Sequence, residues 1–474
     1  MQEQVREITP PTSSWPRGSF ALAVLGLLST LGYLYLFRLS FAGLGPSEPD
    51  HAAITHFLLV YAFLFAAYLL LVLPWVRRGG GMDQRLLWFG VAFGLLFRAI
   101  VLPSDLILEN DIYRYMWDGH MQTEQVNPFR YAPDDPETEP YRTAYWDQIN
   151  YPWVPTIYPP VLQYVFLFSE LIYPGSVVGM KFVLILFDVA VIFLLLWVLP
   201  LYGRPPEWAL IYAWSPLVIK EVANSGHADV VSAFLLVLLL GVAAKGRALA
   251  SSLTLACLTL TKFFGVLLLP LFWRRFGWRH YAAFGGAIGL LYFPFLDWEI
   301  NLFEGFLTYS RTWLFNAGVY ELVVWFFDDV AQFTNRQAGL WARYGLFGVV
   351  CLVVGWQCLR LWKSQSPVDW AWAVFWVLGA LLLCSPVINA WYLVWIVPLL
   401  CLFPSVAWLL LTGLVILAYT YYYDFTFAPW VKWTEYGIFF FVLLIEWLRS
   451  VSKKSPYESI KGGSPPSLEA SPHD

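Results

Sequence analysis

Long apolar runs recur along almost the whole chain, and they constrain its fold more than any other feature. They lie near residues 19–39, 54–76, 84–102, 177–200, 206–221, 228–245, 248–262, 263–273, 281–296, 339–362, 369–386, 390–403, 405–422 and 435–450. A helix needs about 20 apolar residues to cross the hydrocarbon core of a bilayer. Backbone polar groups in that core must be satisfied within the protein, which favours helices. The runs therefore predict an all-α polytopic membrane protein.

The composition agrees with this fold class. Hydrophobic residues make up 59% of the 474-residue chain and charged residues only 13%, whereas a soluble domain carries about 25% charged residues. The net charge of −4 gives no information about nucleic-acid binding, and no nucleic-acid partner is expected for a membrane protein of this class. Five cysteines lie in apolar runs without metal-ligand spacing, and we expect no disulfide among them.

Polar tails flank the apolar part of the chain. Residues 1–18 and 451–474 are rich in Pro and Ser and are predicted to be disordered cytoplasmic tails. Residues 19–450 are predicted to form a single transmembrane domain, in which residues 103–159 make a long outer loop. Several apolar runs are shorter than a full span, so we expect roughly 11 to 14 transmembrane helices.

Basic residues orient these helices. Arg77, Arg78 and Arg85 share one short loop, and further basic groups lie near residues 245–247, 274–279 and 360–363. Because cytoplasmic loops are enriched in Lys and Arg, we place all these loops inside. This orientation requires the apolar stretch 161–173 to lie in the outer interface without crossing. The polar loops on the other face are then 103–159, 221–229, 297–338 and 385–392.

The segment 110–120, NDIYRYMWDGH, begins soon after an apolar run and is unusually polar. On a helix, Asp111, Tyr115 and Asp118 share one face at positions i, i+4 and i+7. The aromatic residues between them give the helix an apolar side, which predicts an amphipathic helix in the interface. Either aromatic anchoring is its whole role, or the helix also brings a carboxylate to a site at the outer face.

Two further stretches carry chemistry on the same face. Lys262 is the single charge in LTLACLTLTKFFGVLLLPL, and a charge inside an apolar run is costly and commonly functional. A lysine can also extend to the interface, which leaves a structural alternative. INYPWVPTIYPP, residues 149–160, must be extended because of its prolines. It is either a stiff linker or an aromatic strip that lines a groove for sugar or lipid.

The segments DIYRYMWDG, NPFRYAPDD and NYPWVPTIYPP together resemble the first outer loop of GT-C glycosyltransferases. The likeness is to the bacterial mannosyltransferase-like branch that uses polyprenyl-phosphate sugars. GHADVVSAFLLVLLL, LTKFFGVLLLPLF, TWLFNAGVYELV and SPVINAWYLVWIVPLL follow in matching order, so the resemblance covers residues 100–403. It implies a GT-C-type bundle in the bacterial inner (plasma) membrane, with its active site facing the periplasm or the cell exterior.

The resemblance also implies the reaction and the partners. A hexose, with mannose favoured, would move from a polyprenyl-phosphate donor to a glycolipid or polysaccharide acceptor, with membrane lipids around the protein. Asp111 is the expected general base of an inverting transfer, and Asp118 and Glu109 are reserve acids. A dipole-complementing acid at the start of a helix is the alternative for Asp111. The family commonly has two adjacent acids where this chain has Asn110 and Asp111. Because a pair of acids could bind a metal, its loss leads us to expect no metal and no other cofactor. A divalent metal remains an alternative.

Other residues on the same face are candidates for binding the donor and the acceptor. The donor phosphate needs cations, and the candidates are Lys262, Arg114, Lys220 and Arg311. Polar groups that could contact the sugar or the acceptor are His227, Asp229, Asn224, Tyr158, Asn127, Asn316, Asn389 and Tyr392. For His227 and Asp229 a structural histidine and a plain helix N-cap remain alternatives.

A lipid-linked sugar flippase or a small-solute transporter is the rival function. Helix breaks at Ser215–Pro216 and Ser385–Pro386 suit a carrier, because carriers bind substrate at such breaks. The two halves of the chain, however, share no matching polar residues, and the chemistry gathers at one face and not at the midplane. We therefore favour the enzyme.

Overall fold

The computed structural model describes residues 15–78, 81–364 and 366–452. Within these ranges the chain is helical, and the β-structure consists of an isolated bridge between Phe315 and Val387. The predicted tails fall mostly outside the described residues. The described part begins with helix at Trp15, inside the tail predicted for 1–18, and ends with helix at Ser452.

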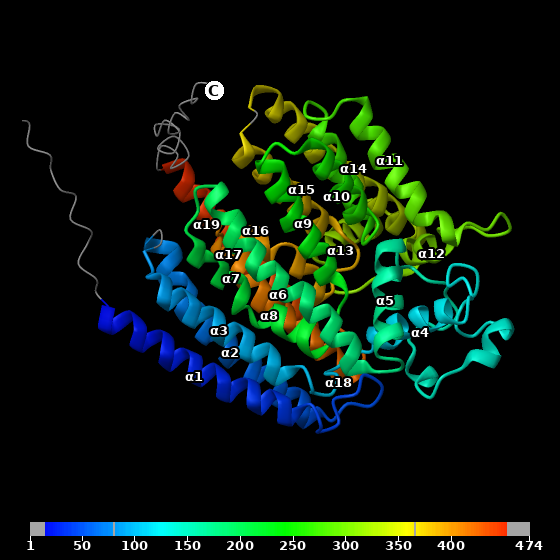
Figure 1. Cartoon of the computed structure of the whole chain (residues 1–474), viewed down its shortest axis with the longest axis horizontal. Helices are drawn as coiled ribbons and strands as arrows, with labels where there is room; N and C mark the ends of the chain where they lie inside the picture. Colours follow the sequence, from blue (N-terminus) through cyan, green and yellow to red (C-terminus); the bar gives the residue numbers. More distant parts are fainter. Residues whose placement is uncertain (1–14, 79–80, 365, 453–474) are drawn as a thin grey trace, which may run out of the picture.

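Three long helices form a layer along one side of the bundle (Figure 1). They are α1 (Trp15–Leu39), α2 (His51–Arg78) and α3 (Gln84–Val101). Asp83 caps α3 by accepting a hydrogen bond from the backbone N–H of Arg85. Among the described residues, seven helices are long and apolar enough to cross a membrane, and these three are among them.

The middle of the chain forms the centre of the bundle and one of its edges, where α11 lies. Its helices are α6 (Val177–Leu201), α9 (Asp229–Ala244), α10 (Ala248–Thr259), the 3-10 helix η5 (Phe263–Phe272), α11 (Trp278–Tyr292) and η6 (Phe293–Phe295). α9 packs against α6 and α10, and α10 packs against α11. α9 is almost entirely buried, because apolar residues surround its whole circumference.

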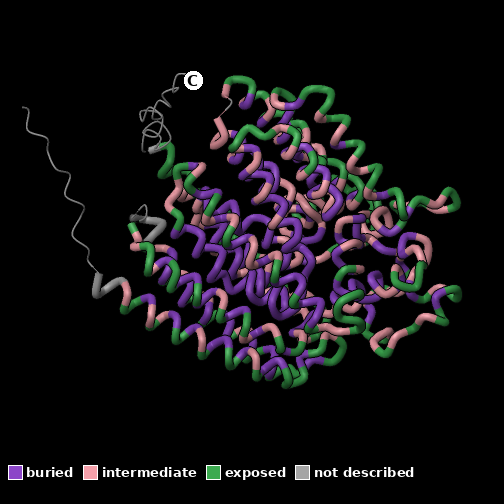
Figure 2. The backbone as a smooth tube through the Cα atoms, viewed as in Figure 1, coloured by how far each residue is buried: buried purple, intermediate pink, exposed green. Residues whose placement is uncertain are grey.

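The C-terminal part completes the bundle with both long and broken helices. They are α14 (Asn335–Lys363), α15 (Pro367–Cys384), η8 (Ala390–Trp395), α16 (Val397–Leu400), α17 (Val406–Leu414), η9 (Val415–Thr420), α18 (Tyr421–Asp424) and α19 (Pro429–Ser452). Figure 2 shows buried residues gathered in the middle of the bundle. Leu352 and Leu359 on α14 are 74% and 69% exposed, which suits a surface that faces lipid.

Short elements gather at one end of the bundle, on the right in Figure 1. They are α4 (Asp111–Thr123), η1 (Pro136–Tyr141), η2 (Trp146–Gln148), α5 (Pro160–Ile172), α12 (Glu304–Thr312), α13 (Gly318–Trp325) and the π-helical η7 (Phe326–Val330). α5 has 13 residues, about 20 Å of helix, too short for a bilayer core of about 30 Å. The predicted all-α polytopic fold with a long loop that carries short helices is confirmed.

The predicted helix break at Ser215–Pro216 has a specific brace. The chain passes through η3 (Pro206–Ala209), α7 (Leu210–Ala213), α8 (Pro216–Val218) and the π-helical η4 (Ile219–Asn224). Arg98 on α3 donates to the carbonyl of Ala213 at 2.7 Å and pairs with buried Asp188 at 2.5 Å. A carbonyl at the break thereby keeps a partner, as burial in an apolar bundle requires. The break sets the position of η4, which carries Lys220 and Glu221.

Candidate active site

Asp111 is the first residue of α4, and its carboxylate meets two other segments. Asn150 lies in residues 149–160, which we call the proline-rich strip, and it donates from Nδ2 to Oδ1 of Asp111 at 2.6 Å. Nδ1 of His227 lies 3.9 Å from Oδ2 of Asp111. The Asp111 side chain is 19% exposed, whereas His227 is completely buried. The carboxylate is therefore oriented by its neighbours and still accessible.

His227 is fixed by packing as well as by charge. Its ring stacks on Trp391 with centroids 3.8 Å apart and planes at 12°. Its Nε2 lies 3.3 Å from a carboxylate oxygen of Glu221. The preceding Gly226 has φ of +68°, and a Cβ there would lie 2.5 Å from a side-chain carbon of Ile112 on α4. Glycine is favoured here because this φ lies in the left-handed region, which other residues rarely adopt.

Glu221 lies at the centre of a buried charged group on η4. Lys220 donates from Nζ to Glu221 at 3.3 Å, and the hydroxyl of Tyr419 donates to the same carboxylate at 3.0 Å. Lys220 and Glu221 are both completely buried. π-helical turns are frequent at functional sites, and this one carries Lys220 and Glu221. Glu221 contacts His227, which follows the turn, and His227 lies beside Asp111.

Glu109 adjoins this group from the loop before α4. Its side chain is 7% exposed. Burial raises the pKa of Glu109 well above its ordinary value, and the positive charge of Lys220 opposes that rise. The negative charge of Asp111, like burial, raises the pKa of Glu109.

Lys262 forms an ion pair with Asp229 at 3.5 Å. The Asp229 side chain is completely buried and that of Lys262 is 18% exposed. Neither oxygen of Asp229 has a hydrogen-bond partner among the described residues. Asp229 is the first residue of α9 and does not cap it, because the N-cap position is Ala228. The plain N-cap alternative for Asp229 is therefore wrong.

Aromatic rings enclose the ammonium group of Lys262. Its Nζ lies 5.6 Å from the ring centre of Tyr158, 5.3 Å from that of Tyr392 and 6.0 Å from that of Trp395. A cation over aromatic faces is stabilised by their quadrupoles. His227, which lies beside Asp111, stacks on Trp391, and Trp391 makes an edge contact with Tyr392 at 6.1 Å between ring centroids. Asp111 and Lys262 therefore belong to one cluster of contacting side chains. Lys262 is held within this cluster, which argues against the alternative that it simply extends to the interface.

Asp118 and Arg114 lie in a separate, closed network on α4. Nε of Arg114 is 2.9 Å from Oδ1 of Asp118, and Gln163 on α5 donates to Oδ2 at 2.9 Å. The hydroxyl of Thr156 also donates to Oδ2. Asp118 is completely buried. Both oxygens of this reserve acid are occupied, and the network joins α4 to α5 and to the proline-rich strip.

Three candidate asparagines hold the loops together. Asn224 accepts from the N–H of Ile107 at 3.1 Å and donates to the hydroxyl of Ser104 at 2.8 Å. Asn127 donates to the carbonyl of Phe295 at 2.9 Å. Asn316 donates to Glu435 at 2.8 Å and is completely buried. Each amide has a protein partner, whereas Oδ1 of Asn316 has none among the described residues. The expected contact of these asparagines with sugar or acceptor stays a prediction.

The remaining candidates have different settings. Tyr158 is buried and its ring makes an edge contact with Tyr115, at 5.0 Å between centroids. Tyr392 shares a hydrogen bond with Tyr309 through the two hydroxyls. Asn389 is half-buried before η8, and Arg311 is exposed in the last turn of α12. Of these, the contacts bring Tyr158 and Tyr392 to Lys262.

Sequence reasoning missed several members of the cluster. Asn150 immediately precedes Tyr151 in the proline-rich segment 149–160. An amide in that otherwise apolar and aromatic segment was the available signal. Glu221 begins the polar turn 221–229, and its charge between two apolar runs was the available signal. Tyr419 and Trp391 lie in apolar runs that contain many aromatic residues, so no local signal singled them out.

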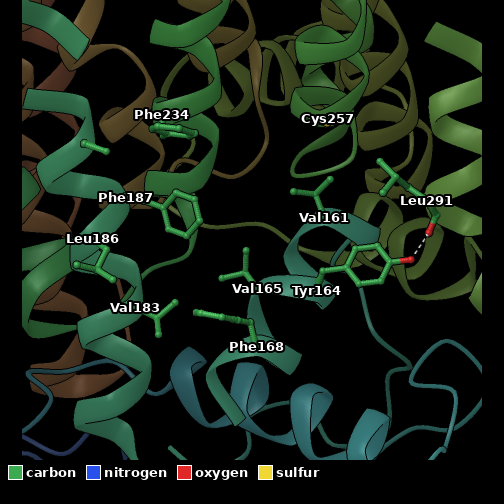
Figure 3. Close-up of a pocket in the computed structure, with 11 residues that line it drawn as sticks. Val161, Tyr164, Val165, Phe168, Val183, Leu186, Phe187, Phe234, Cys257 and Leu291 are labelled. Atoms are coloured by element: carbon green, nitrogen blue, oxygen red, sulfur yellow. Dashed lines mark hydrogen bonds between the residues drawn. The ribbon is translucent and has the colours of Figure 1, made fainter. Parts of the chain in front are cut away.

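An apolar cavity lies beside the Lys262 segment (Figure 3). Its volume is about 520 Å³, and its lining comes from α5, α6, α9, α10 and α11. The N–H of Val161, in this lining, donates to the carbonyl of Leu260 at 3.0 Å. The hydroxyl of Tyr164 donates to the carbonyl of Leu291, as the dashed line in Figure 3 marks. The cavity wall is thereby continuous with the backbone that leads to Lys262.

A family model described as alpha-(1->6)-mannopyranosyltransferase, N-terminal domain, matches residues 35–275 of the chain. This is about half of the chain, and it includes Asp111, His227, Asp229 and Lys262. The chain belongs to the alpha-(1->6)-mannopyranosyltransferase family. No curated protein and no solved structure gave a match.

Membership of this mannosyltransferase family decides between the two functional classes of the sequence analysis. The protein is a glycosyltransferase enzyme of the membrane, and the predicted GT-C mannosyltransferase-like resemblance is confirmed. A mannosyltransferase acts on a sugar donor and a glycan acceptor. Within the described residues, no group of three His, Cys, Asp or Glu side chains could hold a metal ion.

Proposed function

We propose that this mannosyltransferase moves mannose from a polyprenyl-phosphate donor to a glycolipid or polysaccharide acceptor, at the outer face of the bacterial inner membrane. One observation carries the proposal. An accessible carboxylate, Asp111, and a lysine ammonium, Lys262, are joined in a single cluster through His227, Trp391 and Tyr392. A base and a phosphate-binding cation are the two groups that such a transfer needs.

The reaction is a single displacement. The acceptor hydroxyl oxygen attacks the anomeric carbon of the donor sugar, and the bond from that carbon to the phosphate oxygen breaks. Asp111 takes the hydroxyl proton, and polyprenyl phosphate leaves with the electron pair of the broken bond. The transition state resembles an oxocarbenium ion. Displacement inverts the anomeric centre, so an alpha-linked product requires a beta-linked mannosyl phosphate.

His227, Glu221 and Lys220 support Asp111 in this scheme. The stacked and buried His227 keeps its ring beside the Asp111 carboxylate. Glu221 fixes the other side of the imidazole, and Lys220 neutralises Glu221.

The Lys262 ammonium is the proposed partner of the donor phosphate. Asp229 neutralises it in the structure, so an incoming phosphate adds a second anionic partner within an aromatic enclosure. Negative charge that develops on the leaving phosphate is stabilised by a preorganised cation in a site of low dielectric. The scheme uses only side chains of the chain and calls for no metal.

The apolar cavity beside the Lys262 segment supports a lipid-linked donor. It offers about 520 Å³ between helices, and its wall of Phe, Val and Leu side chains suits an isoprenoid chain. A water-soluble sugar nucleotide would gain nothing from such a wall. The two ends of the bundle support the outer-face placement: the basic loops near residues 85, 245 and 274 lie away from the Asp111 cluster.

A transfer assay with purified protein in lipid tests the proposal. Radiolabelled polyprenyl-phosphate mannose is the donor, and a membrane glycolipid extract is the acceptor. The native protein should transfer label, and Asp111→Asn should not. Asp147→Asn is the matched control, because Asp147 is an exposed acid of the same outer loop, and it should transfer normally.

Two results would reject the proposal. Equal transfer by Asp111→Asn and native protein would remove Asp111 as the base. Transfer from a sugar nucleotide, without any from the lipid-linked donor, would remove the polyprenyl-phosphate assignment. Unchanged transfer in the presence of EDTA is expected, and complete loss that Mg²⁺ restores would show a metal requirement.

A further inference from the structure

Four aromatic side chains form a continuous row at the loop-rich end of the bundle. We call Trp153, Tyr151, Trp313 and Tyr309 the aromatic ladder. The ring centroids of Tyr151 and Trp153 are 5.5 Å apart, and those of Tyr151 and Trp313 are 4.6 Å apart. Trp313 and Tyr309 follow at 5.4 Å. The row thus joins the proline-rich strip to α12, although about 150 residues separate them in the chain.

The inner part of the ladder reaches the candidate active site at two points. Tyr151 follows Asn150, which donates to Asp111, and the Asp111 charge acts on the Tyr151 hydroxyl. Tyr309 shares a hydrogen bond with Tyr392, whose ring lies under the Lys262 ammonium. The outer end is open, because Trp153 is 61% exposed and Tyr151 is 45% exposed. The ladder therefore begins at the surface, passes beside the proposed base at Tyr151 and ends at the Lys262 enclosure.

The ladder is held rigidly in place. Gly305 on α12 packs on the strip so closely that a Cβ would lie 2.5 Å from the carbonyl oxygens of Pro155 and Thr156. Arg343 on α14 donates to the carbonyls of Ser310 and Trp313 at 2.7 and 3.0 Å. Tyr151 itself has φ of +47°, a left-handed conformation that costs energy in a non-glycine residue. The surrounding contacts maintain a ring position that the local backbone would not choose.

We propose that the aromatic ladder binds the acceptor glycan, and that it holds sugar rings beyond the one that receives mannose. The proposal rests on the proposed function. Aromatic faces pack against the apolar faces of sugar rings, and a rigid row has little conformational freedom of its own to lose when a glycan binds. Continuity with Asp111 identifies the occupant, because the group that must reach Asp111 is the acceptor hydroxyl. The donor lipid occupies the other side of the cluster, at the cavity beside Lys262.

The ladder makes acceptor length a determinant of recognition. A glycan that covers Trp153 as well as Tyr151 and Trp313 gains contacts that a single sugar cannot make. These contacts do not change during bond formation, so they lower the acceptor KM and leave kcat unchanged. Trp153 is the outermost ring, and its contribution should appear only with the longer acceptors.

The experiment compares Trp153→Ala, Trp153→Phe and Trp298→Ala in the lipid transfer assay. Mannose acceptors of increasing length, each carried on the same short alkyl group, are the substrates. Trp298 is the matched control, because it is completely exposed on the outer loop after η6 and has no ring contact with the ladder among the described residues. Protein yield and melting temperature are measured for each variant.

Trp153→Ala should raise the KM for long acceptors by about 2- to 10-fold and leave that for the single mannose acceptor unchanged. Trp153→Phe should restore the native KM, and Trp298→Ala should match native protein throughout. Equal KM values for native protein and Trp153→Ala at every length would overturn the ladder. Equal loss of membrane insertion in the Trp153 and Trp298 variants, without a KM change, would make both rings bilayer anchors. Absence of transfer by native protein would instead count against the proposed function.

Discussion

Asp111 and Asp118 lie two turns apart on the same face of α4, yet their surroundings differ completely. Asp118 is buried, and Arg114, Gln163 and Thr156 occupy its oxygens. Asp111 is 19% exposed, with a hydrogen bond from Asn150 and His227 nearby. A buried carboxylate with every oxygen satisfied stabilises structure, whereas a partly exposed one can exchange a proton with a substrate. The difference assigns chemistry to Asp111 and architecture to Asp118.

The largest expected effect separates the two acids by rate. Asp111→Asn should lower the transfer rate per folded molecule by about 10²- to 10⁴-fold, because the amide cannot accept the hydroxyl proton. Its melting temperature should remain close to that of native protein. Single-turnover transfer in lipid measures the rate. A variant that keeps more than a tenth of native activity would contradict the distinction between the acids.

The second prediction concerns the contribution of Asp118 to the stability of the protein. Asp118→Asn should lower the free energy of unfolding by about 3–5 kcal/mol, because it leaves the Arg114 guanidinium buried without its anion. Thermal unfolding in detergent measures the loss. Arg114→Met combined with Asp118→Leu removes both charges and should recover much of the stability. An unchanged melting temperature in Asp118→Asn would show that the network is not structural.

Lys262 is expected to combine the catalytic role assigned to Asp111 with the structural role assigned to Asp118. Lys262→Met should lower the rate about 10- to 100-fold, the worth of a charge-assisted hydrogen bond to the donor phosphate, and should raise the donor KM. It should also destabilise the protein, since buried Asp229 loses its partner. Lys262→Met with Asp229→Asn should regain stability and remain slow. Recovery of activity in the double variant would assign Lys262 a structural role alone.

The smallest effect concerns pH. Burial raises the pKa of Glu109 above its ordinary value of 4.5, so the folded state binds this proton more tightly than the unfolded state. The stability that Glu109 contributes is therefore fully present below pH 4.5 and is lost as pH rises through the raised pKa. Glu109→Gln should melt at the native temperature in acid and slightly higher at pH near 8.

Melting curves of both proteins across this pH range test the last prediction. A constant difference at every pH would show that the Glu109 carboxyl does not titrate with folding. Transfer activity should survive in Glu109→Gln, since the residue is buried away from the accessible edge of Asp111. Loss of activity with intact folding would return Glu109 to the position of base.

Part of the candidate site was visible in the sequence for clear reasons. Lys262 is a lone charge in an apolar stretch, and Asp111 begins a polar helix after a membrane run. Charges placed where they are costly are informative without a structure. Asn224, Asn127 and Asn316 have the same residue type as possible sugar ligands, yet their amides bind backbone or carboxyl groups of distant segments. Residue type alone cannot reveal which partner an amide finds.

The sequence by itself determined the polytopic helical fold, because hydrophobic run length acts locally along the chain. Only the tertiary structure decided which acid is closed and which is accessible. It also brought Tyr419 to Glu221 and Trp313 to Tyr151. Contacts between segments that lie more than a hundred residues apart depend on how helices pack, and an apolar pattern that serves many packings does not specify one.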